Sequence, residues 1–108
     1  MLLEIQNDTD TTIVRCSGRI VQGDGANDML RAVMSQASRH IQLDLSRVNA
    51  IDAGGLGALV ELAKWARDAN RSIQLLNPSP RVRAALETTG LSSVLRIDPA
   101  IRSRSEAA

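Results

Sequence analysis

Residues 40–70 constrain the fold most, because a strand pattern changes there to a long helical pattern across a glycine-rich turn. Residues 40–46 alternate between aliphatic and polar side chains, which predicts a strand with one buried face. A loop is expected over 47–52. From residue 54 or 55 to 70, apolar residues recur at helical spacing and cover more than half of the helix circumference. That arc is wider than packing on one sheet requires.

The same two patterns alternate along the rest of the chain. Two short aliphatic runs on either side of an Asn-Asp-Thr-Asp turn predict a hairpin. Asp24 is expected to cap the next helix, and Ser79 with Pro80 is typical of another helix start. The further expected elements are strands over 2–6 and 11–17, a helix over 26–38, a strand over 72–77, a helix from 80 to a cap at Gly90, and a short strand over 94–97.

The order of these elements predicts an α/β chain with two layers. A hairpin followed by strand–helix–strand crossovers implies a mixed sheet of four or five strands. Right-handed crossovers would place successive helices on the same face of that sheet. The polar residues of strand 40–46 agree, because a strand buried on both faces would not carry them. We expect a single domain over 1–100 and a flexible tail over 101–108.

Composition argues against several functional classes. Thirteen basic and twelve acidic residues leave a net charge of +1, and Trp65 is the only aromatic residue, so no nucleic-acid surface is predicted. Cys16 has no second cysteine to pair with, which fits a reducing compartment. The N-terminal residues do not resemble a signal peptide, and no apolar run approaches the roughly 20 residues of a membrane span. A cytoplasmic protein without direct membrane insertion is expected.

No arrangement of residues indicates catalysis. One cysteine and one histidine do not make a metal site, so neither a metal nor a cofactor is expected. For Cys16 and His40, an inert buried cysteine is a better interpretation than a catalytic dyad. The glycines at 54 and 55 lack the pattern of a phosphate-binding loop or a dinucleotide fingerprint. With Asp52 as N-cap they indicate a tight strand-to-helix turn, and we do not expect an enzyme.

The segment from Ile41 to Gly57 resembles the signature of STAS domains, which are shared by anti-sigma factor antagonists and sulfate transporters, and the similarity covers nearly the whole chain. A hydrophobic strand ending in Asp-Leu-Ser leads to Asp-Ala-Gly-Gly-Leu-Gly from Asp52, where the family carries Asp-Ser-Ser-Gly-Leu-Gly. In the antagonists of this family, the second serine of that motif is the phosphorylation site, and the resemblance implies that position 54 is its equivalent here. Their partner kinase is itself the anti-sigma factor, and phosphorylation prevents binding. Here Ala53 and Gly54 replace the two serines, so Gly54 is an equivalent that cannot be phosphorylated.

The resemblance implies a regulatory module of the anti-sigma factor antagonist type that binds an anti-sigma factor or a related kinase-fold protein. Phosphorylation would add about −1.5 to −2 charge, and without it binding is expected to be constitutive. We expect a monomer or a weak homodimer. The predicted partner-binding residues lie at the helix start, on the preceding loop and on the helix flank: Asp52, Ala53, Gly54, Gly55, Leu56, Gly57, Gln22, Asp24 and Trp65.

Other interpretations stay open on the sequence. One is a STAS subunit of an ABC-type lipid transport or signalling-scaffold assembly. Another is a sensor of a nucleotide or other small ligand, against which the lack of a nearby lysine or aromatic residue counts. Trp65 is explained at least as well by packing on the sheet edge as by partner binding. Phosphorylation of another residue, such as Ser46, is also open.

Overall fold

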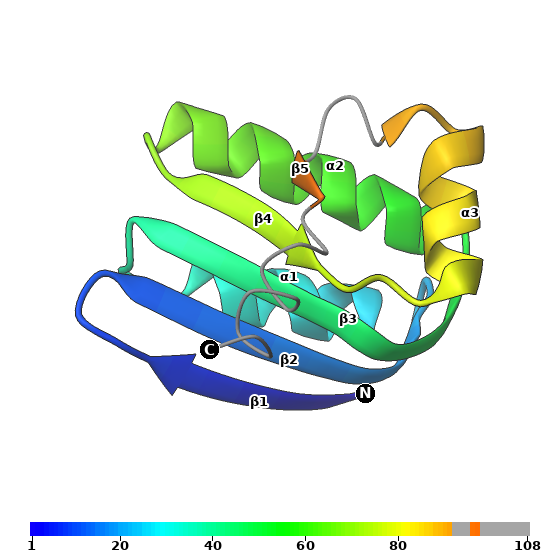
Figure 1. Cartoon of the computed structure of the whole chain (residues 1–108), viewed down its shortest axis with the longest axis horizontal. Helices are drawn as coiled ribbons and strands as arrows, with labels where there is room; N and C mark the ends of the chain where they lie inside the picture. The colour runs from blue at the N-terminus through cyan, green and yellow to red at the C-terminus, as the bar shows by residue number, and fades with distance from the viewer. Residues whose placement is uncertain (92–95, 98–108) are drawn as a thin grey trace, which may run out of the picture.

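A computed structural model gives the structure of the chain and describes residues 1–91 and 96–97. Within these ranges, strands and helices follow one another in the predicted order (Figure 1). The elements are β1 (Leu2–Asn7), β2 (Thr11–Ile20), α1 (Ala26–Met34), β3 (His40–Ile51), α2 (Ala53–Asp68), β4 (Ser72–Leu76), α3 (Pro80–Thr88) and β5 (Arg96–Ile97). Of the predicted last strand, 94–95 lie outside the described residues, as does the expected tail over 101–108.

The strands form one mixed sheet in the order β1-β2-β3-β4-β5. β1 is antiparallel to β2, and every other neighbouring pair is parallel. The hairpin is closed by the backbone N–H of Asp8, which donates to the carbonyl of Thr11 at 2.7 Å. The sheet predicted from a hairpin followed by crossovers is therefore confirmed.

The sheet buries one face, as the alternation predicted. Val14, Leu43 and Leu75 lie in register on neighbouring strands and are fully buried. Each such side chain contributes about 1.5–3 kcal/mol through burial. On the opposite face of β2 and β3, Arg15 approaches Asp44, with 3.9 Å between Nε and Oδ2. Buried residues of all three helices form one hydrophobic cluster with the buried face of the sheet. The predicted fold of two layers is therefore confirmed.

The wide apolar arc of α2 is explained by its neighbours. α1 and α2 lie behind the sheet in Figure 1, whereas α3 stands at the end where β3 finishes. α2 packs against α1 as well as against β2, β3 and β4, and therefore buries side chains in two directions. Its buried residues are Gly55, Ala58, Leu59, Leu62 and Ala66. Among the helices of the described residues, none has the length and hydrophobicity of a membrane span.

The predicted loop over 47–52 is wrong, because β3 continues to Ile51. β3 carries one more residue than β2 between the pairs Arg15–Asp44 and Ser17–Arg47, which makes a bulge at this point. The extra residue shifts the alternation by one, so that Val48 returns to the core. The period-two pattern ends at Ser46 although the strand does not.

α1 differs from its prediction at both ends. It ends at Met34 and not at Ser38, and its N-cap is Gly25 and not Asp24. Gly25 has a φ of 102°, and a β-carbon there would overlap the carbonyl oxygen of Arg19, so glycine is required. Asp24 instead accepts a hydrogen bond from Arg19, at 3.1 Å between Nη2 and Oδ2. Both side chains are exposed, so this ion pair adds little stability.

Candidate protein-docking site

Asp52 caps the N-terminus of α2, as predicted. Its backbone is extended, with φ −119° and ψ −173°, and its Oδ1 accepts a 2.8 Å hydrogen bond from the backbone N–H of Gly55. The N–H of Leu56 donates to the carbonyl of Asp52 at 2.9 Å and closes the first turn. A helix start leaves its first N–H groups without partners inside the helix, and the carboxylate satisfies one of them. Asp52 therefore fixes where α2 begins.

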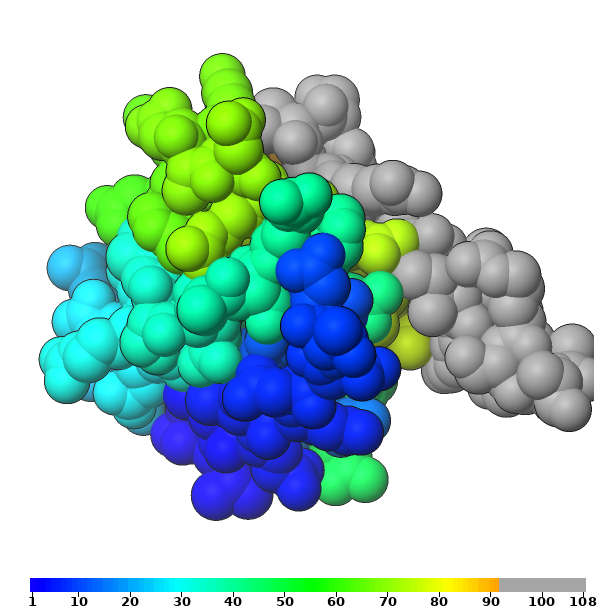
Figure 2. Space-filling model, turned by 90° about the vertical axis from the view of Figure 1, so that its left-hand side faces the viewer, coloured from blue at the N-terminus to red at the C-terminus, as the bar shows by residue number. Residues whose placement is uncertain are grey.

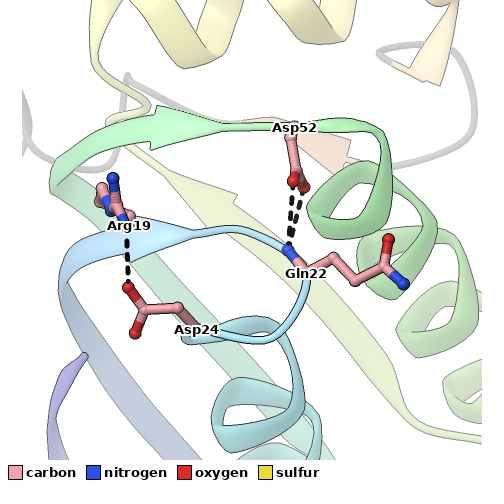
Figure 3. Close-up of polar contacts among 4 residues, drawn as sticks. All are labelled: Arg19, Gln22, Asp24 and Asp52. Carbon is pink, nitrogen blue, oxygen red and sulfur yellow. Dashed lines mark hydrogen bonds and ion pairs between the residues drawn. The ribbon is translucent and has the colours of Figure 1, made fainter.

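The same carboxylate also holds the loop over 21–25, which joins β2 to α1. The backbone N–H of Gln22 lies 3.2 Å from both oxygens of Asp52, 30 residues away in the sequence (Figure 3). Inside the loop, Val21 and Asp24 exchange backbone hydrogen bonds of 3.2 and 3.0 Å. The turn between them includes Gly23, whose φ of 80° suits glycine. The loop is thus a closed turn anchored on the helix cap.

Two glycines at the start of α2 allow this loop and the end of β2 to approach the helix. A β-carbon on Gly55 would overlap the carbonyl oxygen of Ile20 and lie 2.9 Å from a side-chain carbon of Ile51. A β-carbon on Gly54 would lie 2.5 Å from Cβ of Gln22. Gly57, by contrast, would meet nothing within 4 Å. The tight turn predicted from these glycines is therefore also a close contact between two chain segments.

The two anchoring contacts lower the pKa of the Asp52 carboxyl below its ordinary 3.8. The N–H of Gly55 is the largest cause, partial desolvation opposes it, and the N–H groups of Gln22 and Gly54 add to it. Because the folded pKa is the lower one, the carboxylate stabilises the fold above the unfolded pKa. This contribution is lost as the pH falls through the lowered pKa. We expect an NMR titration of the Asp52 carboxyl carbon to give a midpoint below 3.8; a midpoint at or above 3.8 would contradict the double anchoring.

Most of the predicted site residues at this end of the molecule are at least partly exposed. Asp52, Ala53 and Gly57 are exposed and Gly54 and Leu56 are half-buried, with Gln22 and Asp24 exposed on the adjacent loop. A hollow of about 370 Å³ lies between this loop, α1 and the first turns of α2. Gly55 is buried, so it supports the surface from below and offers no contact of its own.

Comparison with known families decides the chain's identity. The family model described as "Mlab, STAS domain" matches residues 4–97. The chain belongs to the STAS domain family. The resemblance seen in the Ile41–Gly57 segment is thereby confirmed, and it extends over nearly the whole chain.

Relatives and structural neighbours of this STAS domain include anti-sigma factor antagonists. A Bordetella bronchiseptica protein, BtrV, described as a candidate anti-sigma factor antagonist, is 28% identical over 102 residues, covering 92% of this chain and 85% of that protein. A candidate antagonist from Thermotoga maritima matches with a TM-score of 0.82 at 22% identity, covering 96% of this chain and 92% of that one. Unphosphorylated SpoIIAA of Bacillus matches with a TM-score of 0.74 at 18% identity, covering 98% and 96%. These matches confirm the STAS fold.

Cys16 and His40 of this STAS domain do not form a dyad. Burial, together with the negative charge of Asp44, raises the pKa of the Cys16 thiol to about 12, which keeps it protonated and unreactive. His40 is exposed at the start of β3, where its Nδ1 lies 2.7 Å from Oγ of Ser72. His40 pairs in register with Thr11, so roughly 17 Å of strand separates it from Cys16.

Trp65 lies toward the far end of α2, about 18 Å of helix from Ala53. The guanidinium of Arg71 lies over its ring, 5.1 Å from the centroid. Arg71 also donates hydrogen bonds to the carbonyls of Gln36 and Ser38. These bonds join the connection that precedes β3 to the connection that precedes β4. Both connections lie at the end of the molecule that faces the viewer in Figure 2. Packing accounts for Trp65 here, and partner binding by it stays a prediction. No spacing in the sequence pointed to Arg71.

Proposed function

We propose that this STAS domain is a regulatory protein-binding module of the anti-sigma factor antagonist type, which captures an anti-sigma factor or a related kinase-fold protein in the cytoplasm. The observation that carries the proposal is the exposed start of α2, which Asp52 holds against the loop over 21–25. Ala53, Gly54 and Gly57 offer shape and backbone groups there but no nucleophile or general base. The action proposed for this surface is therefore binding of a partner.

Capture by this surface has no serine switch. Neither Ala53 nor Gly54 has a hydroxyl group that could accept a phosphoryl group. The charge of about −1.5 to −2 that a phosphate would place at the helix tip is therefore never added. Control then rests on the amount of the protein or on another domain.

A capture experiment with a mass measurement tests the proposed function. The immobilised chain retains a kinase-fold protein from an extract of its own source cells, and incubation with that protein and ATP leaves the intact mass of the chain unchanged. Ser46 is exposed in the β3 bulge, and a gain of one phosphate there would contradict constitutive binding. Retention of an ABC transporter ATPase in place of a kinase-fold protein would favour the transport-assembly interpretation.

A charge placed on the tip should block capture without unfolding the domain. Ala53→Glu adds a carboxylate in the first turn of α2, where the helix dipole favours it. We expect the affinity for the captured partner to fall about tenfold or more, measured by calorimetry. Ala84→Glu makes the same change at an exposed position of α3 and should leave the affinity unchanged. Equal losses in the two variants would contradict docking at the α2 start.

A further inference from the structure

The space beside Gly54 is already filled by the loop. A β-carbon on Gly54 would lie 2.5 Å from Cβ of Gln22, 3.2 Å from its Cα and 3.2 Å from its Oε1. Two of these three atoms move only with the loop backbone, so rotation of the Gln22 side chain would not remove the overlap. Figure 3 shows the Gln22 side chain running from the loop toward the first turn of α2. A side chain at position 54 and Gln22 therefore compete for one place.

Gln22 cannot move away without breaking other contacts. Its N–H is held by both oxygens of Asp52, and its neighbour Val21 makes backbone hydrogen bonds with Asp24 and Ala26. The end of β2 is held as well, since Ile20 pairs in register with Ile51 of β3. The loop is therefore held at both sides of Gln22.

We propose that Gln22 replaces the side chain of residue 54 on the docking surface, so that the partner contacts a carboxamide from the loop where a hydroxyl would otherwise stand. The carboxamide is neutral and both donates and accepts hydrogen bonds, so it fits a polar, uncharged group of the partner. This recognition rests on the proposed function, whereas the competition between Gln22 and residue 54 is a property of the free domain. A serine introduced at position 54 would displace the loop and would not by itself create a phosphorylation switch.

A set of single and double variants of the free domain tests the competition. Gly54→Ser should lower the midpoint of urea unfolding and speed amide hydrogen exchange over the loop. Combining it with Gln22→Gly, which removes the overlapping Cβ, should recover most of both losses. Combining it with Gln22→Ala, which keeps that Cβ, should recover little. Equal losses from Gly54→Ser in the wild-type, Gln22→Gly and Gln22→Ala backgrounds would overturn the proposal.

Partner affinity tests the recognition step separately. Gln22→Ala leaves the loop backbone and its bonds to Asp52 in place but removes the carboxamide. We expect it to lower the affinity for the captured partner about tenfold in calorimetry. An unchanged affinity would overturn recognition through Gln22 while leaving the proposed function standing. Failure of the proposed function would show itself differently, as no capture by the wild-type chain, whatever the stabilities of the variants.

Discussion

In Gly55→Ala, the free energy of unfolding falls by about 1–3 kcal/mol, although alanine favours a helix more than glycine does. The added β-carbon would overlap the carbonyl oxygen of Ile20, the last residue of β2, which pairs in register with Ile51 of β3. Either β2 or the start of α2 must shift, and the contacts around the Asp52 cap loosen with it. Urea unfolding followed by circular dichroism measures the change.

Gly57→Ala is the matched control for this variant. Gly57 lies in the same helix, two residues further on, is exposed, and would meet nothing within 4 Å on gaining a β-carbon. There the helix preference of alanine acts alone, and the free energy of unfolding should rise by about 0.5–1 kcal/mol. If the free energy of unfolding changed in the same direction in both variants, the close approach of Ile20 would not be the reason why position 55 requires glycine.

Asp52→Ala should reduce the affinity for the captured partner about thirtyfold or more. This is the loss expected when a residue at the centre of an interface is truncated. The substitution removes the N-cap acceptor for Gly55 and both acceptors for Gln22. The helix start then frays and the loop is released, so both halves of the docking surface lose their fixed positions. Calorimetric titration gives the affinity, and circular dichroism at the same temperature verifies that the variant is folded.

Asp52→Asn separates the two tasks of this carboxylate. Asparagine is as good an N-cap as aspartate, so the bond from Gly55 and the start of α2 are kept. The N–H of Gln22 then faces a neutral side chain, and only one of its two acceptor oxygens remains. We expect near wild-type stability, faster amide exchange at Gln22 and an affinity between those of the wild type and Asp52→Ala. An affinity equal to that of the wild type, together with faster exchange at Gln22, would mean that the loop plays no part in docking.

Local patterns predicted most of the fold. The alternation in 40–46, the helical spacing after Gly54, and the Ser79–Pro80 start each depend on near neighbours in the sequence. The errors arose where a distant segment decides the structure. The β3 bulge exists because β3 is paired with β2, so no pattern within 47–52 could reveal it. The N-cap of α1 is Gly25 and not the predicted Asp24. Residue 25 must be glycine because the carbonyl of Arg19, six residues away, leaves no room for a β-carbon there.

The candidate site was predictable in its residues but not in its construction. The Asp52–Gly57 motif and the loop residues Gln22 and Asp24 followed from the sequence and the family resemblance, and the structure brings Gln22, Gly54 and Gly57 together around one hollow. That Asp52 also holds the loop depends on the fold, because Gln22 is 30 residues away. The sequence could not show that Trp65 lies about 18 Å of helix from Ala53, and a contact between Trp65 and the partner stays a prediction.

An NMR titration of the isotope-labelled chain with its captured partner tests the central claim most directly. The claim is that the start of α2, together with the loop that Asp52 fixes against it, forms the partner's docking surface. We expect the largest changes in backbone shifts at Gln22, Asp24 and the residues from Asp52 to Gly57, with little change in α3 or around Arg71. Changes confined to β1, to α3 or to the surroundings of Arg71, with the start of α2 unaffected, would contradict it.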